Sequence, residues 1–332
     1  MSKLALLFSD LHIHNYKQFD HNGSRLENCL RVLDRVFVFA DKNGIDTILF
    51  AGDLYDRQQA LPTVVINATV ERFHALFVKY PTITFYAISG NHDQASKNLL
   101  HIEAETALKH LSIVFENKFI LIDNQYADIQ DDAGNIARVV GVPYYEMAEH
   151  YAEKLAEVTN DFVADATTHI LLCHQTPKGI MNTGIPFDTD PTDGVYEKYD
   201  MVFCGHIHAG QDLSDNFKVV GSPIHRDKAD EGTDKGFFAV DLFNPKNTRF
   251  FSLNKHFPTF KSVFEDMIEG ETNDELDWVV VVPRLDQIKQ SETAKVESFN
   301  TSLSNEQLVR NFWEQQDGQN KELLEMGLSF IN

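Results

Sequence analysis

The chain has 332 residues, of which 43% are hydrophobic and 24% are charged, a composition typical of globular proteins. No apolar run approaches the roughly 20 residues that a membrane-spanning helix needs, and the N-terminus lacks the long apolar segment of a signal peptide, so we expect a soluble, cytoplasmic protein and not a membrane or secreted one. The net charge of −21 disfavours nucleic acid as a ligand at long range unless cations or a partner protein intervene.

Apolar runs alternate with amphipathic stretches over the first 256 residues. Two stretches, 26–43 and 64–79, have apolar residues at helical spacing, and they are followed by Gly44 and Pro81, which favour helix ends. Short apolar runs predict buried strands at residues 4–8, 47–51, 82–88, 139–142, 170–173, 201–204 and 237–242. This alternation of strands and helices predicts an α/β layered fold.

The sequence pattern changes near residue 257. Residues 265–277 are acidic, residues 278–283 form a strand-like run, and residues 286–304 are polar enough to be a linker. From residue 305 onward, two apolar stripes at helical spacing predict amphipathic helices: Leu308, Val309, Phe312 and Trp313, then Leu323, Leu324 and Leu328. We therefore expect three parts: a main domain over 1–256, a small appended α/β module with a linker over 257–300, and a C-terminal helical segment over 301–332.

Five polar motifs each follow one of the predicted strands. In chain order they are Asp10-x-His12, Gly52-Asp53 with Asp56, Gly90-Asn91-His92-Asp93, the single His174, and Gly205-His206-x-His208. Ligands bind beyond the carboxyl ends of the strands in open α/β sheets, so five motifs at that edge can converge in space. Any one motif alone would be an ordinary turn, helix cap or buried histidine, but their order and their strand context favour a shared site.

The residue types in these motifs suit divalent metal ions. Asp, Asn and His donate oxygen and imidazole nitrogen, which favours Mn, Fe(II) or Zn over copper or an iron–sulfur cluster. Asp10 and His12 are two positions apart, as are His206 and His208, so an extended backbone would project each pair to one side. The carboxylate of Asp53 could bridge two metals roughly 3.5–4 Å apart, a spacing that stabilises both the attacking and the leaving oxygen of a phosphoryl displacement.

Glycines and cysteines near the motifs have separate expected roles. The glycines at positions 52, 90 and 205 allow the backbone to approach the site closely. The cysteines at positions 29, 173 and 204 lie in or beside apolar runs and lack zinc-site spacing, so we expect them to be buried in the core and not to bind metal.

The set D-x-H, G-D-x-x-D, G-N-H-D, H and G-H-x-H resembles the signature of the calcineurin-like metallophosphoesterase family, over roughly residues 1–245. The resemblance implies a layered sandwich of mixed β-sheets flanked by helices. It also implies two divalent metal ions. We expect Mn²⁺, with Mg²⁺, Fe²⁺ and Zn²⁺ as alternatives. By resemblance, the ligands of the first ion are Asp10, His12, Asp53 and His208, and those of the second are Asp53, Asn91, His174 and His206.

The same resemblance assigns three neighbouring residues to catalysis. His92 would lie beside the scissile phosphate, stabilise the developing charge and assist the leaving oxygen. Asp93 would orient His92, and Asp56 would support the metal ligands. A non-catalytic scaffold on the same fold is one alternative, but such a protein is expected to lack ligands, and this chain has every ligand position of the pattern.

Residues 221–236 indicate which members of this family the chain resembles most. Gly221-Ser222-Pro223, Asp230-Glu231 and Lys235-Gly236 are similar to the segment that follows the last metal motif in SbcD-type DNA repair nucleases. This resemblance implies 3′ to 5′ exonuclease activity on duplex DNA and endonuclease activity on single strands, in DNA repair and recombination. A phosphodiesterase or phosphatase acting on small nucleotides is the other alternative, because the fold alone does not choose the substrate.

The resemblance to SbcD-type nucleases also implies partners. The module 257–300 would cap DNA, and the C-terminal helices would bind an SMC-like ATPase of the SbcC type, in an ATP-regulated complex that contains a homodimer of the nuclease subunit. The negative net charge of the chain is consistent with a subunit that does not bind DNA alone and whose basic partner holds the DNA. Asp56, where archaeal and eukaryotic relatives have histidine, is similar to bacterial and phage versions, and the compact length most resembles phage-encoded nuclease subunits. The expected cytoplasm would be that of an infected bacterium if the chain is phage-encoded.

Overall fold

The computed structural model describes residues 3–20, 23–57, 60–95, 105–160, 166–182, 185–186, 194–264 and 278–282. These residues belong to one unit that spans Met1–Val282. The predicted C-terminal helical segment, 301–332, lies outside the described residues, as do residues 283–300 of the predicted linker.

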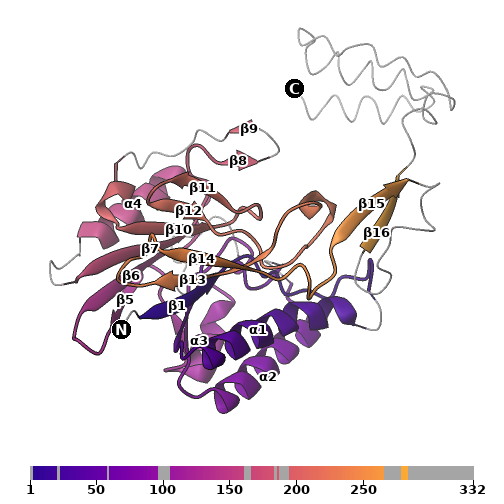
Figure 1. The fold of residues 1–332 in the computed structure, drawn as a ribbon, viewed down its shortest axis with the longest axis horizontal. Helices are drawn as coiled ribbons and strands as arrows, with labels where there is room; N and C mark the ends of the chain where they lie inside the picture. Colours follow the sequence, from indigo (N-terminus) through magenta and orange to yellow (C-terminus); the bar gives the residue numbers. More distant parts are fainter. Residues whose placement is uncertain are drawn as a thin grey trace, which may run out of the picture. The chain divides into compact units, whose positions relative to one another are not determined.

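Six strands form the first mixed sheet (Figure 1). Their order across the sheet is β14 (Thr248–Ser252), β13 (Gly236–Asp241), β1 (Leu4–Phe8), β2 (Thr47–Phe50), β3 (Thr84–Ala87) and β4 (Phe119–Leu121). Strands β1 to β4 are parallel to one another, whereas β13 pairs antiparallel with both β1 and β14. The carboxyl ends of β1, β2 and β3 therefore lie at the same edge of the sheet.

The second mixed sheet also has six strands. Their order is β11 (Gln211–Ser214), β12 (Phe217–Val219), β10 (Met201–Gly205), β7 (Thr168–His174), β6 (Ile136–Val142) and β5 (Gln125–Gln130). The central strands β12, β10, β7 and β6 are parallel, and β11 and β5 pair antiparallel at the two edges. The register places Gly205 of β10 beside His174 of β7, so two of the motifs are neighbours in this sheet.

Four layers account for the core. Alternate residues of β1 face opposite sides: Ala5 and Leu7 join a cluster with residues of the second sheet, whereas Leu6 and Phe8 join a cluster with the helices α1 (Ser24–Lys42), α2 (Thr63–Lys79) and α3 (Leu108–Phe115). The outer face of the second sheet packs against α4 (Ala148–Asn160) through residues such as Tyr151. The order helix, sheet, sheet, helix confirms the predicted α/β sandwich of mixed sheets flanked by helices.

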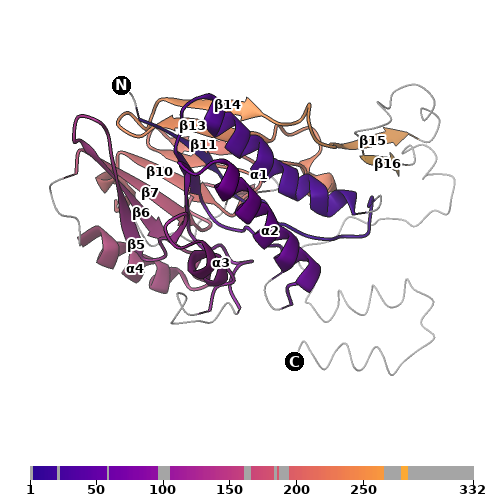
Figure 2. The ribbon, with the colours of Figure 1, turned by 90° about the horizontal axis from the view of Figure 1, so that it is seen from below.

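The two predicted helices are confirmed, and they lie side by side (Figure 2). The face of α1 that carries Leu33, Val36 and Phe37 is fully buried, as its helical spacing predicts. The chain leaves α1 through Gly44, whose φ of +66° favours glycine. No helix among the described residues combines the length and the apolarity that crossing a membrane requires.

A parallel pair of short strands, β15 (Phe260–Phe264) and β16 (Trp278–Val282), lies in the region predicted to be an appended module. Glu231 anchors this pair, because its carboxylate accepts hydrogen bonds from the backbone N–H and the hydroxyl of Ser262. Trp278 packs against the rings of Phe19 and Phe260. The intervening residues 265–277 lie outside the described residues, and the predicted boundary at residue 257 stays a prediction.

The sequence pattern does not predict several of the described elements. These are the helices α3 and α4, the short strands β8 (Met181–Asn182) and β9 (Ile185–Pro186), the edge strands β4, β5, β11 and β14, the strands β12 and β15, and the 3₁₀ turns η2 (Tyr196–Lys198) and η3 (Lys228–Asp230). Of these elements, η3 bears on the candidate site, because Asp230 at its end is buried beneath the last motif.

Candidate metal centre

The five motifs meet where the carboxyl ends of β1, β2, β3, β7 and β10 converge. Their side chains form three groups whose ligand atoms lie within 4.8 Å of one another: Asp10, His12 and His208; Asp53, His174 and His206; and His12, Asp56 and His92. Most of these side chains are buried, whereas His92, His206 and His208 are half-buried and define the accessible side of the cluster. The structure therefore brings together all the residues that the sequence pattern selects.

The first group surrounds the Nε2 atom of His12. This atom lies 3.0 Å from Nε2 of His208, 3.5 Å from Oδ2 of Asp53 and 3.9 Å from Oδ1 of Asp10. Two imidazole nitrogens and two carboxylates thus point to a common region. This is the donor set that the resemblance implies for the first ion.

The second group shares Asp53 with the first. Oδ2 of Asp53 lies 3.3 Å from Nε2 of His174, which lies 3.2 Å from Oδ1 of Asn91. The same Asn91 oxygen lies 2.9 Å from Nδ1 of His206. Because one oxygen of Asp53 approaches both His12 and His174, its carboxylate stands between the two groups, at the position that a bridging ligand requires.

The backbone of these motifs differs from the extended conformation expected for Asp10 and His12. Both residues have left-handed φ values, 53° and 48°, as do Asp53 and His206, with 61° and 85°. The expectation of an extended backbone was therefore wrong, although the side chains of Asp10 and His12 do reach the same group, with His208. Left-handed residues instead turn the chain sharply after β1, β2 and β10, a conformation that costs about 1–3 kcal/mol per residue and that clusters at functional sites.

Two glycines permit the close approach of the motif loops. A Cβ atom on Gly90 would lie 2.1 Å from Oδ1 of Asp53, and one on Gly52 would lie 2.4 Å from Nδ1 of His174. Any side chain at either position would displace a proposed ligand. The predicted role of these glycines is confirmed by these distances.

Hydrogen bonds fix the orientation of the donors. Nδ1 of His174 donates to the carbonyl of Ala51 at 2.7 Å, which leaves the Nε2 lone pair available to a metal. The carboxylate of Asp10 accepts from the backbone N–H of His206, and Oδ1 of Asp53 accepts from the backbone N–H of His92 at 2.8 Å. The remaining Asp53 oxygen, Oδ2, is thereby directed at the two groups.

The electrostatics of the cluster fit divalent cations. Burial opposes the charge of Asp53, but His174, His12 and His92 together outweigh it and hold the pKa of Asp53 below its usual range. Burial likewise opposes a charged His174, yet Asp53 raises the pKa of His174 to about 10. Burial lowers the pKa of His12 and lowers that of His206 to about 3, so both are neutral and have lone pairs to donate. A metal would replace the proton that His174 holds against Asp53.

His92 and Asp56 lie in the cluster with His12, but the contact that orients His92 differs from the predicted one. Nδ1 of His92 donates to the backbone carbonyl of Asp56 at 2.5 Å, so Asp56, and not Asp93, orients the imidazole. Asp93 is fully buried, and its carboxylate accepts the backbone N–H groups of Asp53, Leu54, Tyr55 and Gly90 at 2.8–3.2 Å. Asp93 therefore fixes the loop that presents Asp53, because a carboxylate saturated by four backbone donors has little capacity left for a side chain.

A buried lysine supports the last motif, and sequence reasoning did not assign it a role. Nζ of Lys235 donates to the carbonyl of His208 at 2.7 Å and pairs with Oδ1 of Asp230 at 2.5 Å. Burial opposes the charge of Asp230, but Lys235, together with the backbone N–H of Arg226 and His208, outweighs it and lowers the pKa of Asp230. The backbone N–H of Ser222 donates to the same His208 carbonyl. The segment 221–236 thus positions a proposed ligand, and its resemblance to a nuclease motif was the signal available.

We expect Lys235→Met to weaken Mn²⁺ binding about 10–100-fold, since supports of metal ligands have effects of this size. It should also lower the free energy of unfolding by about 3–5 kcal/mol, because Asp230 would stay buried without its partner. Calorimetric titration and chemical denaturation measure the two effects.

Lys235→Arg, which keeps the charge, should retain a higher affinity for Mn²⁺ than Lys235→Met. The control Lys218→Met removes a lysine whose partner Asp212 is 69% exposed, and it should change neither quantity. Unchanged metal affinity in Lys235→Met would refute the positioning role.

The cysteines lie apart from the candidate ligands. Cys29, Cys173 and Cys204 are all buried and unpaired, as expected. None of the three candidate metal groups found among the described residues includes a cysteine. The donor set therefore contains oxygen and nitrogen without thiolate, which suits Mn, Fe(II), Mg or Zn.

Comparisons with known proteins agree with this site. Residues 4–210 match the model of the family described as calcineurin-like phosphoesterase. The chain is 25% identical over 279 residues to the D subunit of nuclease SbcCD from Staphylococcus epidermidis, covering 76% of this chain and 70% of that protein. It is 24% identical over 294 residues to exonuclease subunit 1 of Enterobacteria phage T4, covering 86% and 79%.

Among solved structures, a dimetal phosphatase from Danio rerio matches 76% of this chain and 99% of its own, with 8% identity and a TM-score of 0.44. TT1561 of Thermus thermophilus also matches 76% of this chain, and all of its own, with 13% identity and a TM-score of 0.43. The family model covers more than half of the chain, and the metal motifs up to His208 lie inside the matched residues. The chain belongs to the calcineurin-like phosphoesterase family.

Proposed function

We propose that the chain is the nuclease subunit of an SbcCD-like complex and that it hydrolyses phosphodiester bonds of DNA. The observation that carries this proposal is the convergence of a complete two-metal donor set around Asp53, with His92 at its accessible side. Family membership supports a metal-dependent phosphoester hydrolase, and two relatives bear nuclease names. The substrate, the activities and the metal preference stay proposals.

The proposed ligands divide between two ions. Asp10, His12 and His208 would hold one, Asn91, His174 and His206 would hold the other, and Asp53 would contact both. When bound, two such ions stabilise the charge that develops on the phosphate and on the attacking and leaving oxygens. Mn²⁺ is the ion that we propose first, with Mg²⁺, Fe²⁺ and Zn²⁺ as alternatives of the same ligand chemistry.

His92 is proposed to act on the leaving oxygen. Its Nδ1–H is held by the Asp56 carbonyl, so the ring is fixed and its Nε2 is the atom left for the substrate. The ring meets that of His12 edge to face, with centroids 4.8 Å apart, which places it beside the proposed metal ligands. A protonated Nε2 can donate its proton to the 3′ oxygen as the P–O bond breaks.

A nuclease assay tests the proposed function. The purified chain should degrade DNA in the presence of Mn²⁺, and a chelator should abolish this activity. Duplexes labelled at either end and circular single strands separate 3′ to 5′ exonuclease from endonuclease activity. Hydrolysis of nucleotide monomers without any cleavage of DNA would instead favour the small-molecule phosphodiesterase or phosphatase, and no hydrolysis of either would favour a scaffold.

A partner protein is part of the proposal. One relative is named as the D subunit of SbcCD and the other as subunit 1 of an exonuclease, names that belong to multi-subunit enzymes. The net charge of −21 disfavours unaided DNA binding, which a basic SMC-like ATPase of the SbcC type would overcome. We propose that residues 305–332 bind this ATPase, that ATP regulates cleavage, that the chain forms a homodimer in the complex, and that 257–300 caps the DNA.

Truncation after Ser304 tests the proposed partner segment. Cleavage of a small phosphodiester with Mn²⁺ should be unchanged, while ATP-stimulated cleavage of duplex DNA with the partner present should be lost, because aromatic anchors on a docking helix often dominate affinity. Phe312→Ala/Trp313→Ala should reproduce the loss. Gln307→Ala/Glu314→Ala, on the opposite side of the predicted helix, is the matched control. A truncated chain that no longer folds would place the segment in the core and contradict the docking role.

A further inference from the structure

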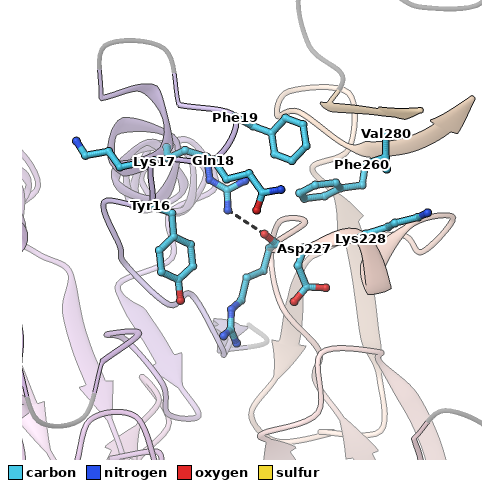
Figure 3. A pocket seen from close by; sticks show the side chains of 10 residues that line it. Tyr16, Lys17, Gln18, Phe19, Asp227, Lys228, Phe260 and Val280 are labelled. Carbon is cyan, nitrogen blue, oxygen red and sulfur yellow. Dashed lines mark hydrogen bonds between the residues drawn. The ribbon is translucent and has the colours of Figure 1, made fainter. Parts of the chain in front are cut away.

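A cavity of about 570 Å³ lies between residues 16–19, the loop 226–228 and the β15–β16 pair (Figure 3). Four of its lining residues are basic, and one is acidic: Lys17, Arg25, Arg226 and Lys228, with Asp227. The whole chain has the opposite balance, with 29 basic and 50 acidic residues. The cavity is therefore a local site of positive charge, which favours an anionic ligand.

Arg25 is a buried cation in this lining. The residue is 3% exposed, and its Nη1 has no hydrogen-bond partner among the described residues. Nε donates to His14 at 3.2 Å and Nη2 donates to the carbonyl of Arg226 at 2.8 Å, both of which are neutral acceptors. Trp278 stacks on the guanidinium at 4.1 Å. A buried charge with an unused donor and no ion-paired carboxylate in the described part of the chain is costly, and an anion in the adjoining cavity would offset the charge of Arg25.

Arg226 and Tyr16 connect the cavity to the metal centre. Nε of Arg226 lies 3.3 Å from Oδ1 of Asp56, and the Tyr16 hydroxyl donates to the other oxygen of the same carboxylate. Asp56 in turn belongs to the group that contains His12 and His92. A single side chain thus separates the cavity from the residues proposed to act on the scissile bond. One polymeric substrate can therefore reach both places.

Aromatic rings form another wall of the cavity. Figure 3 shows Phe19 and Phe260 facing each other near Val280, and their ring centroids lie 5.4 Å apart in an edge-to-face arrangement. Lys17 and Lys228 lie on opposite sides of these residues in the same view, with their side chains directed outward. A cationic groove with aromatic side chains is the combination that binds a single nucleic-acid strand, because cations contact phosphates and rings contact sugars and bases.

We infer that this cavity binds a phosphate of the substrate strand that flanks the phosphate under attack. The inference rests on the proposed nuclease function and names a second contact with the same strand. Arg25 and Arg226 supply guanidinium groups to the lining, and the exposed Lys17 and Lys228 supply further positive charge. The site would favour polymers over mononucleotides, because a mononucleotide has no flanking phosphodiester to fill it.

Neutral phosphate analogues test this inference in the full-length protein loaded with Mn²⁺. Oligonucleotides that carry one uncharged methylphosphonate, moved one position at a time along the strand, are compared with the unmodified strand. In the wild type, one flanking position should lower kcat/KM by about tenfold or more, the size of a lost charge-assisted hydrogen bond. Lys17→Ala/Lys228→Ala and Arg25→Gln should lose most of this discrimination. Both substrates meet the same metal centre in each variant, so the ratio cancels damage to the centre.

A matched control removes two other lysines. Lys109→Ala/Lys246→Ala takes away the same charge from exposed positions that do not line the cavity, and it should discriminate as the wild type does. The salt dependence of KM for the oligonucleotide gives a second readout. The slope of log KM against the logarithm of the salt concentration should fall by about 2 for Lys17→Ala/Lys228→Ala and stay unchanged for the control. If both cavity variants still discriminate between the unmodified and the methylphosphonate strand as the wild type does, the inference is overturned.

Two further outcomes separate the possible failures. A wild type that cleaves DNA but discriminates at no flanking position contradicts the phosphate site and leaves the nuclease function standing. A wild type that cleaves no DNA contradicts both. Inorganic phosphate, the other source of the same chemistry, should be displaced from the cavity by the oligonucleotide in a competition titration. Phosphate that stays bound beside a saturating oligonucleotide would assign the cavity to the free ion and overturn the inference.

Discussion

Replacing Asp53 with Asn should lower the turnover of a phosphodiester by about a thousandfold or more and weaken the binding of both metal ions. Oδ2 of Asp53 approaches His12 and His174 at 3.5 and 3.3 Å, so it is the carboxylate oxygen that stands between the two groups. The amide has no charge with which to offset two divalent ions, and a loss of several kcal/mol of metal stabilisation corresponds to a factor of this size.

Calorimetric titration with Mn²⁺ and the turnover of a small phosphodiester are the measurements for Asp53→Asn. The control Asp212→Asn makes the same chemical change at a carboxylate that is 69% exposed on β11, and it should leave both quantities at wild-type values. A thermal melt shows whether each variant folds. Near-wild-type turnover of folded Asp53→Asn in Mn²⁺ would contradict the assignment of Asp53 as the ligand that contacts both metal ions.

Replacing His92 with Asn should lower kcat by about 10²–10⁴-fold while two metal ions remain bound, since this is the range for loss of a general acid. The loss should depend on the leaving group. A substrate that releases p-nitrophenolate needs little proton donation, so it should lose much less activity than one that releases an alkoxide, such as the 3′ oxygen of DNA. A merely structural role of His92 would lower both activities equally.

Metal content after gel filtration is the companion measurement for His92→Asn. His74→Asn, at an exposed position on α2, is the matched control and should behave as the wild type. If the His92 variant retains one ion in place of two, His92 is a ligand and the proposed division of roles is wrong.

The sequence predicts the central strands and the clustering of the motifs for one physical reason. Strands buried on both faces have continuous apolar runs, and parallel strands end at one edge, so residues that follow β1, β2 and β3 must meet. The conformation of the motifs was not predictable in the same way. A two-residue spacing is compatible with many turns, and only the packed loops hold Asp10 and His12 in left-handed conformations.

Contacts between residues that lie far apart in the sequence are the part of the site that sequence patterns could not predict. Lys235 reaches the His208 carbonyl across 27 positions, and Arg25 reaches the Arg226 carbonyl across 201 positions. No periodicity relates such pairs. The orienting contact of His92 was misassigned to its neighbour Asp93 for a similar reason, since adjacency in sequence suggested a contact that the fold gives to the backbone of Asp56.

The four backbone hydrogen bonds to Asp93 have a consequence for metal exchange. Three of them, from Asp53, Leu54 and Tyr55, join the loop after β2 to the loop after β3, so protein groups alone tie the two loops together around Asp53. A site preformed in this way can lose and regain its ions without refolding, unlike small domains that fold only with metal. Oxygen and nitrogen donors of this kind select weakly among divalent ions, so the supply of each metal, and not the folding history of the chain, would decide which ion it carries.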